Sequence, residues 1–230
     1  MLSVVFMLWD DPKFRWKAYY RYTADHVNRA AAMIARNLDM PHRFICVTDK
    51  PQGIASHIQI MPLRPDLLKL GRSWSKLALF APDALANFGP WVLCLDLDMV
   101  VVNKLDPLIS DHDIRINGPT APGMFYNGSM VLLKTGTRNQ LWSEFNPERA
   151  SILVGENPVG ASDQWWYYKC LGPNEAKWSA KDGVLSYRNH MKGPLPAHSR
   201  IVFFPGPWDP CMPAIRQQHD WVRANWRLGP

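Results

Sequence analysis

The spacing of hydrophobic residues changes along the first 48 positions of the chain. Ser3 to Leu8 is a short run of apolar, β-branched and aromatic residues, which predicts a buried strand. The turn that closes it is Trp9, Asp10, Asp11 and Pro12. Helical spacing follows at Val27, Ala31, Ile34 and Leu38. With a second strand over Arg43 to Thr48, the pattern predicts a βαβ unit, a parallel sheet and a ligand cleft at the carboxyl ends of its strands.

The same pattern of alternating elements continues to the end of the chain. Strands are expected at Val92–Leu95, Met130–Leu133 and Ile201–Phe204, and helices at Trp74–Phe88 with a break at Pro82, Arg138–Phe145 and Asp163–Cys170. Loops are expected at Pro62–Gly71 and at Pro205–Pro213, where continuing aromatic residues indicate a loop over a site. We therefore predict an α/β fold, a single domain over residues 1–230 with a mainly parallel central sheet flanked by helices.

Two carboxylates interrupt the most apolar run of the chain, WVLCLDLDMVVV. Asp96 and Asp98 are separated by one residue and therefore project to the same side of an extended chain. Because burying unpaired carboxylates is costly, we expect both at the end of the strand, facing a cleft and sharing a divalent cation. Such a cation stabilises a diphosphate as a leaving group, which sugar transfer from a nucleotide donor requires. The alternative is a strand that ends in two solvated aspartates.

The segment LDLDMVV resembles the strand with a metal-binding DxD motif in glycosyltransferase family 8 and its bacterial and phage relatives. Four further segments follow the family's order: SWSKLALFAPDAL, YNGSMVLLKTG, ASDQWW and IVFFPGPWDP. The resemblance covers nearly the whole chain. It implies a GT-A (Rossmann-like) fold and a hexosyltransferase that uses a uridine diphosphate (UDP) sugar with Mn²⁺ or Mg²⁺ and retains the anomeric configuration.

The resemblance also implies roles for single residues. Lys76 is expected to reach the phosphate or sugar of the donor, Asn127 to lie near the donor sugar, and Gly206 to belong to the segment that closes over the diphosphate. Asp163 is expected to orient the sugar and Gln164 to lie at its reacting face, so they are the candidate catalytic residues. A double displacement needs a nucleophile here, whereas an internal-return mechanism needs none.

One position departs from the family pattern. The family supplies a histidine as third metal ligand in the closing segment, but Phe203 and Pro205 cannot coordinate a metal. Asp209 lies in that region and is the candidate third ligand beside the DxD pair; a water molecule, or weaker dependence on metal, is the alternative. His198 and His219 are nearby in sequence, but surface histidines are more often simply solvated.

The expected fold also locates the nucleoside part of the donor. Base and ribose should lie at the carboxyl end of the first strand, beside Trp9 and Asp10. Thr48 and Asp49 should flank them from the second strand.

Composition bears on the acceptor. The net charge of +6 and the pI of about 9.2 favour a polyanionic partner such as a nucleotide, nucleic acid or an acidic glycan. Aromatic and basic residues interleave beyond the DxD motif, a mixture that suits stacking on a base or a sugar. They are Arg115, Asn117, Trp165, Trp166, Tyr167, Tyr168, Trp178, Tyr187, Arg188, His190 and Lys192. The acceptor is therefore either a hydroxymethylated base of phage-type DNA, flipped out of the duplex, or the hydroxyl of a saccharide, lipid or protein.

The sequence also indicates where the protein works. No apolar run predicts a membrane span, and the run Leu2 to Trp9 has no basic leader. The four cysteines, Cys46, Cys94, Cys170 and Cys211, form no CxxC pair. We expect a reduced cytoplasmic setting, which is the host cytoplasm if a phage encodes the protein.

Two other classes of protein fit parts of the sequence. A nucleotidylyltransferase also uses a βαβ fold and acidic metal ligands, but the first strand here leads into LWDDPKF, without the glycine-rich phosphate loop. A noncatalytic protein that binds nucleic acid or sugar on the same fold is supported by the absent histidine. Retention of Asp96, Asp98, Asn127, Asp163 and Gln164 argues for the enzyme.

Overall fold

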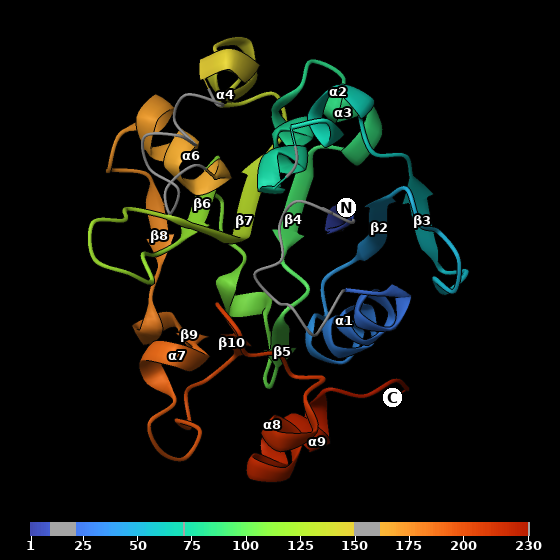
Figure 1. The fold of residues 1–230 in the computed structure, drawn as a ribbon, viewed down its shortest axis with the longest axis vertical. Helices are drawn as coiled ribbons and strands as arrows, with labels where there is room; N and C mark the ends of the chain where they lie inside the picture. The colour runs from blue at the N-terminus through green and yellow to red at the C-terminus, as the bar shows by residue number, and fades with distance from the viewer. Residues whose placement is uncertain (10–21, 71, 150–161, 230) are drawn as a thin grey trace.

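The computed structural model describes residues 1–9, 22–70, 72–149 and 162–229, and everything below concerns that part of the chain. It contains a seven-stranded sheet in the order β3-β2-β1-β4-β7-β6-β8 and a three-stranded sheet in the order β5-β10-β9 (Figure 1). Helices lie on both sides of the larger sheet. The predicted α/β fold, with a mainly parallel central sheet flanked by helices, is confirmed.

The first βαβ unit forms as the hydrophobic pattern predicts. Strand β1 (Leu2–Leu8) leads to helix α1 (Ala24–Asn37), and β2 (His42–Thr48) returns parallel to β1 along its full length. A strand that the sequence analysis missed, β3 (Ile58–Met61), extends the sheet from β2 in the same direction.

Strand β4 (Trp91–Leu95) is the middle strand of the sheet, parallel to β1, and ends directly before the DxD motif. Its other neighbour, β7 (Asn127–Lys134), is antiparallel and pairs in turn with β6 (Ile114–Asn117). The edge strand β8 (Ala176–Trp178) is parallel to β6. Because β4 and β7 run in opposite directions, the carboxyl end of β4 meets the amino end of β7.

The sheet separates two hydrophobic cores. Alternate residues of β1 contribute to each: Val4 and Phe6 pack with α1, while Val5 and Met7 pack on the opposite side. The second core is covered by the 3₁₀ helix η1 (Arg72–Phe80), α3 (Ala84–Phe88) and α6 (Asp163–Leu171). Burial on both sides explains why β1 and β4 read as continuous apolar runs.

Three predicted elements have different boundaries or types. The single helix expected over Trp74–Phe88 is a 3₁₀ helix, η1 (Arg72–Phe80), followed by α3 (Ala84–Phe88) beyond Pro82. The predicted loop at 62–71 contains a short helix, α2 (Pro65–Leu68). The helix expected from Arg138 is only α4 (Gln140–Ser143), because Arg138 has a φ of 56°, a left-handed conformation that cannot lie inside a right-handed helix.

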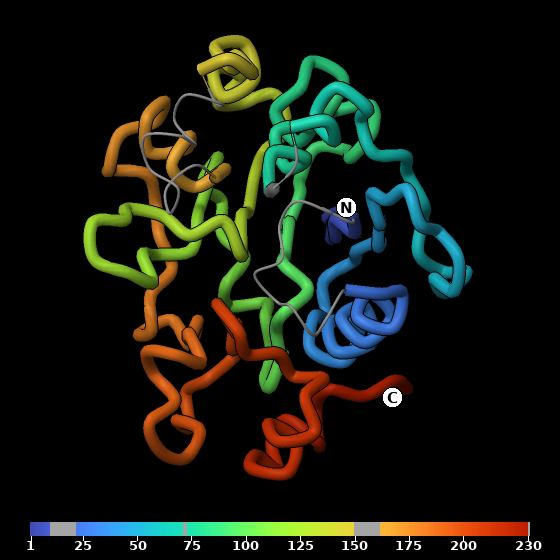
Figure 2. Tube along the Cα trace, in the orientation of Figure 1, coloured from blue at the N-terminus to red at the C-terminus, as the bar shows by residue number. Residues whose placement is uncertain are grey.

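A second, smaller sheet lies against α1 and takes its strands from the middle and from the C-terminal third of the chain. The small sheet joins β5 (Met99–Val101) to β10 (Ile201–Phe203) and β9 (Val184–Ser186). Figure 2 shows the chain then running past α1. The short helices of the described regions outside the central core are η2 (Asp106–Leu108), η3 (Ala180–Asp182), α7 (Tyr187–His190), α8 (Pro213–Gln218) and α9 (Asp220–Asn225). None of the helices described is long and apolar enough to cross a bilayer.

Candidate functional site

A buried lysine connects the DxD motif to the predicted catalytic aspartate. Lys76, on η1, is 3% exposed, and its Nζ lies 2.6 Å from Asp96 Oδ1 and 3.4 Å from Asp163 Oδ2. The ammonium also donates to the carbonyl oxygen of Gly128 at 2.6 Å. Burial alone lowers the pKa of Lys76, but the charges of Asp163 and Asp96 outweigh it and raise the pKa above its ordinary value. The lysine is therefore charged and surrounded by acceptors of the protein itself.

Asp163 is held at the start of α6 by contacts from two other elements. Its Oδ1 accepts a hydrogen bond from Ser73 Oγ at 2.5 Å, and its backbone N–H donates to the same hydroxyl at 3.3 Å. A Cβ placed on Gly128 would stand 2.1 Å from Asp163 Oδ2, so only glycine allows this approach. Beside it, Gln164 Oε1 accepts from the backbone N–H of Gly128 at 3.2 Å. Asp163 and Gln164 therefore both contact Gly128, at the beginning of β7.

Asn127 lies at the beginning of β7 and orders the chain around it. Its Nδ2 donates to Thr120 Oγ1 at 2.9 Å, and its Oδ1 accepts from the backbone N–H of Ser129 at 2.9 Å. The carbonyl of Ser129 in turn accepts from the backbone N–H of Asp96 at 2.9 Å. The structure thus brings Asn127, Asp163 and Gln164 to the same edge of the sheet as the DxD motif.

The charges of three carboxylates act on the hydroxyl of Tyr22. Asp98 is hydrogen-bonded to that hydroxyl, and the pKa of Tyr22 is raised well above its ordinary value by burial and then by the charges of Asp98, Asp209 and Asp96. The backbone reinforces this arrangement, since Phe204 at the end of β10 donates to the Asp98 carbonyl at 2.8 Å. The segment after β10 therefore begins beside Asp98, and the loop over a site predicted for Pro205–Pro213 stays a prediction.

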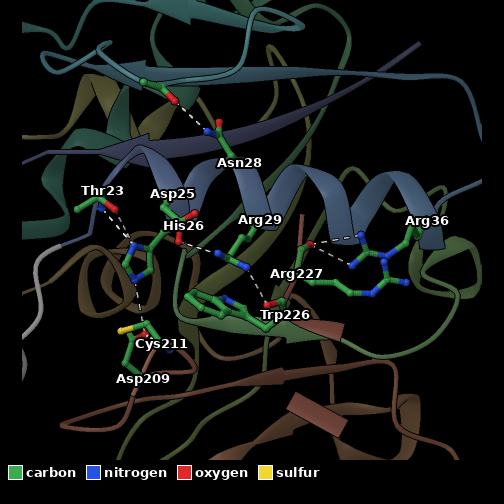
Figure 3. Close-up of polar contacts among 11 residues, drawn as sticks. Thr23, Asp25, His26, Asn28, Arg29, Arg36, Asp209, Cys211, Trp226 and Arg227 are labelled. Atoms are coloured by element: carbon green, nitrogen blue, oxygen red, sulfur yellow. Dashed lines mark hydrogen bonds and ion pairs between the residues drawn. The ribbon is translucent and has the colours of Figure 1, made fainter. Parts of the chain in front are cut away.

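Asp209 has neighbours that the sequence did not reveal. It is fully buried, accepts from the Cys211 backbone N–H at 2.9 Å, and its Oδ1 lies 3.6 Å from His26 Nε2 (Figure 3). That distance fits an electrostatic pair but is too long for a hydrogen bond. The ligand-type atoms of His26, Asp209 and Cys211 lie within 4.8 Å of one another. A helical histidine in the first βαβ unit thus reaches the closing segment.

His26 is oriented by its own helix start. The backbone N–H of Thr23 and its hydroxyl both lie 3.2 Å from His26 Nδ1. When Nδ1 accepts from the backbone, the ring proton sits on Nε2 and points toward Asp209. In that tautomer Nε2 carries the proton and has no lone pair for a metal, so His26 faces Asp209 as an electrostatic partner. The sequence signal was a histidine three residues after a threonine at a helix start, a spacing typical of reciprocal capping.

The carboxylates suit a hard divalent cation. Asp96 pairs with Lys76 through Oδ1, and the charges of Asp96, Asp98 and Asp209 all act on the Tyr22 phenol. Carboxylate oxygens are the ligand type that Mn²⁺ and Mg²⁺ prefer, although within the described residues the ligand atoms of Asp96, Asp98 and Asp209 are not gathered within 4.8 Å of one another. The four cysteines are free thiols, and burial raises the pKa of the Cys46 and Cys94 thiols to about 12, so these two are protonated and poor metal ligands.

The predicted nucleoside-binding residues are only partly grouped. Trp9 packs at the margin of the second core, directly after β1, and Asp49 is exposed directly after β2. Since β1 and β2 are parallel neighbours, both residues lie at one edge of the sheet. Asp10 lies outside the described residues. Gly206 has a φ of 89°, a left-handed conformation that favours glycine and lets the chain turn after β10.

Several aromatic residues expected at the acceptor belong to the core instead. Trp166, Tyr167 and Trp178 are at most 1% exposed, and the indole N–H groups of the two tryptophans donate to the carbonyls of Leu141 and Leu108. Packing in the hydrophobic core, rather than contact with a ligand, therefore explains why these positions are aromatic. The rings that stay near the surface form a stack in which Tyr168 lies between Phe125 at 4.0 Å and Trp165 at 5.4 Å.

The two tail histidines have local partners. His198 Nε2 lies 3.0 Å from the carbonyl of Ala180, and His219 Nε2 lies 2.9 Å from the hydroxyl of Tyr187. Burial lowers the pKa of His219, which favours its neutral form. Both are used in structural contacts around the small sheet.

Comparison with known proteins finds similarity in the fold and none in the sequence. The sequence matches no protein-family model and no curated protein. The structure is similar to that of the galactosyltransferase LgtC in complex with donor and acceptor sugar analogues, with a TM-score of 0.59, 14% identity, and coverage of 99% of this chain and 97% of LgtC. An active-site mutant of LgtC superposes with a TM-score of 0.61 at 14% identity over the same shares of the two chains.

A second glycosyltransferase has the same fold. GlyE of Streptococcus pneumoniae matches with a TM-score of 0.61 and 13% identity. The match covers 98% of this chain and 62% of GlyE, so the chain spans less than two thirds of that relative. The described structure therefore has the GT-A fold of these glycosyltransferases, at a sequence identity that relates the folds alone.

Proposed function

We propose that this protein is a glycosyltransferase that moves a sugar from a nucleotide diphosphate donor, a UDP-sugar as in family 8, to a hydroxyl acceptor with the help of Mn²⁺ or Mg²⁺. The observation that carries the proposal is the buried network in which Lys76 joins Asp96 of the DxD motif to Asp163 at the start of α6. A solvated strand end would not require a fully buried lysine with three acceptors. The fold shared with glycosyltransferases supports the same assignment.

Asp96, Asp98 and Asp209 are the proposed metal ligands. A bound cation would neutralise the donor diphosphate and stabilise it as a leaving group. Lys76 fixes the orientation of Asp96 by a 2.6 Å ion pair, and its three protein acceptors favour this positioning role. The direct contact of Lys76 with the donor that the sequence predicted stays a prediction.

Asp163 and Gln164 are the proposed residues at the sugar. Both are anchored to Gly128, Asp163 by close packing and Gln164 by a hydrogen bond, so their side chains are preorganised. Asn127 and Gly206 bind the donor from the start of β7 and from the closing segment, and Trp9, Asp10 and Asp49 contact its nucleoside. Retention of the anomeric configuration is proposed on the family 8 resemblance.

The acceptor is proposed to approach from the side of α6. Trp165 and Tyr168 follow Gln164 on that helix, and Phe125, which precedes β7, stacks on Tyr168. These rings offer flat faces for a sugar ring or an extruded base. The two acceptor classes, a saccharide and a hydroxymethylated base in DNA, differ in charge, and the positive net charge of +6 favours the second.

The test is donor turnover in the presence of a panel of nucleotide sugars, Mn²⁺ or Mg²⁺, and acceptors that include hydroxymethylated DNA and oligosaccharides. Release of nucleoside diphosphate that disappears in Asp98→Asn supports the proposal. The matched control is Asp113→Asn, an aspartate that is 47% exposed and paired with Lys134, and it should retain turnover. If no donor is bound or turned over with either metal, the protein is a noncatalytic binding protein on the same fold.

A further inference from the structure

The C-terminal helices and α1 enclose a groove remote in sequence from every proposed catalytic residue. Its volume is about 410 Å³, and its described lining is Arg29, Pro213, Arg216, Gln217, Arg223, Trp226 and Arg227. Four of these residues are arginines and none is acidic. The arginines come from α1, α8, α9 and the segment after α9, so the tertiary fold, and not a local run of charge, gathers them. Figure 2 shows this C-terminal segment running beside α1.

Trp226 is the aromatic residue in the lining of this groove. It is 5% exposed, and the guanidinium carbon of Arg29 lies 4.5 Å from its ring centroid while that of Arg216 lies 6.0 Å away. Arg29 also donates to the Trp226 carbonyl at 3.2 Å and to Asp25 Oδ2 at 2.7 Å (Figure 3). The ring thus positions two guanidinium groups by cation–π contacts. Asp25 pairs with Arg29, so the guanidinium of Arg216, held near the Trp226 ring, is the group that can meet a ligand.

Two buried donors of the groove lack a hydrogen-bond partner among the described residues. They are the Nε of Arg216 and the indole Nε1 of Trp226. Buried donors are almost always satisfied, so an unsatisfied pair in a cationic groove indicates an acceptor that binds there. An ion pair ties Arg223 to Asp220, whereas the described residues provide no carboxylate within ion-pair distance of Arg216.

The local excess of positive charge extends beyond the groove. Burial and then the nearby charge of Arg227 lower the pKa of Arg36, which lies next to the groove on α1 and donates to the Asn225 carbonyl at 2.7 Å. Guanidinium groups that repel one another gain free energy from a shared anion. Arginine recognises phosphate best, because its planar fork donates two parallel hydrogen bonds to phosphate oxygens.

We propose that this groove is a binding site for a phosphate-bearing ligand, with Arg216 and Trp226 as its central donors. The volume accommodates a diphosphate or two adjacent phosphates of a nucleic-acid backbone. Its lining shares no residue with the Asp96–Asp98 cluster, so the proposal stands independently of sugar transfer. The ring centroid of Trp226 lies 5.8 Å from that of His26, so the groove adjoins the His26–Asp209 pair.

The experiment measures binding of inorganic pyrophosphate and, separately, of a short DNA duplex by calorimetry, in buffer with a chelator so that no metal-dependent donor site contributes. The wild-type chain should bind, and Arg216→Gln should weaken binding by about tenfold or more, as expected for loss of a charged donor. Arg216→Lys keeps the charge without the fork and should give an intermediate loss. Circular dichroism verifies folding; if Arg216→Gln does not fold, Arg223→Gln, at a side chain 52% exposed, replaces it.

The matched control is Arg64→Gln. Arg64 also lies over a tryptophan, 4.5 Å from the ring centroid of Trp142, but it does not line the groove. Loss of affinity in Arg216→Gln and not in Arg64→Gln supports the site. If Arg216→Gln loses affinity for both pyrophosphate and the DNA duplex, the ligand's phosphates can come from nucleic acid. If it loses affinity for pyrophosphate alone, the ligand is a small phosphate compound. Equal affinity of wild type and Arg216→Gln, or equal weakening by Arg64→Gln, overturns the proposal.

Discussion

The carboxylate of Asp163 lies so close to Gly128 that a Cβ at position 128 would stand 2.1 Å from Asp163 Oδ2. The contact joins the start of α6 to the start of β7, and Lys76 completes it by donating to the Gly128 carbonyl. The geometry of the proposed sugar-binding residues therefore depends on a residue that carries no side chain.

Gly128→Ala should displace Asp163 and lower both stability and turnover. The overlap involves a buried carboxylate that Ser73 also holds, so it cannot be relieved by rotating an exposed side chain. We expect a loss of about 1–3 kcal/mol in the free energy of unfolding, measured by urea denaturation, together with reduced donor turnover. Gly193→Ala is the control, because nothing lies within 4 Å of its Cβ. Equal behaviour of the two variants would contradict the packing argument.

Lys76→Met should be strongly destabilising. It removes the ammonium from between Asp96 and Asp163 and leaves two carboxylates without their cation, Asp163 being 3% exposed. Breaking a buried pair in this way costs about 3–5 kcal/mol, which chemical denaturation detects directly. Lys134→Met removes a lysine that is 53% exposed and 3.6 Å from Asp113, and should change stability by less than about 1 kcal/mol. A small effect at Lys76 would mean that the carboxylates are solvated.

Manganese affinity separates the roles of Asp98 and Asp209. Both lie near Tyr22, but Asp209 also faces His26 at 3.6 Å. If both coordinate the metal, Asp98→Asn and Asp209→Asn should each weaken Mn²⁺ binding by at least about tenfold, measured from the electron paramagnetic resonance signal of free Mn²⁺. Asp113→Asn serves as the control. Unchanged affinity in Asp209→Asn would assign this residue to the pair with His26 and leave the third metal ligand to water.

Asp106→Asn should alter the pH dependence of stability. Burial raises the pKa of Asp106, but hydrogen bonds from the backbone N–H groups of Asp39 and Met40, at 3.1 and 3.0 Å, outweigh it and lower the pKa. A lowered pKa in the folded state adds stability above the unfolded value of about 3.9, and this stability disappears as the pH falls through the folded value.

The Asp106 variant should therefore lose about 1 kcal/mol at neutral pH, the typical value of such hydrogen bonds at a partly exposed site. The difference from wild type should shrink at acid pH, where the carboxyl of the wild-type protein is protonated. Urea denaturation of the variant and the wild type at neutral and at acid pH measures this difference in stability. A difference that does not change with pH would show that packing, and not the charge of Asp106, stabilises this turn.

Local pattern was sufficient for the first βαβ unit and for β4. Their signals are strong because β1 and β4 are buried on both sides and α1 repeats apolar residues at helical spacing. Asp96 and Asp98 were recognisable for the same reason, as carboxylates that interrupt a buried strand. Motif order pointed to Asp163, Gln164 and Asn127, which the structure gathers at one edge of the sheet.

The small sheet could be predicted only in part. The strand expected at Ile201–Phe204 is β10, whereas β5 and β9 are three residues each, too short for a period to be distinguished from chance. Arg138 has a left-handed backbone conformation, and α4 therefore begins only after it. An arginine gives no sign of this conformation in the sequence. Trp166 and Trp178 looked like ligand-binding residues, because composition does not distinguish a buried ring from an exposed one.

The sequence by itself determined the α/β class, the central strand and the carboxylates at its end, since these depend on periods and residue types within one segment. Only the tertiary structure decided which distant side chains meet. It set Lys76 between Asp96 and Asp163, brought His26 to Asp209, and assembled arginines from separate helices around Trp226. The physical reason is that such contacts arise from the packing of whole elements against a twisted sheet, which no local period encodes.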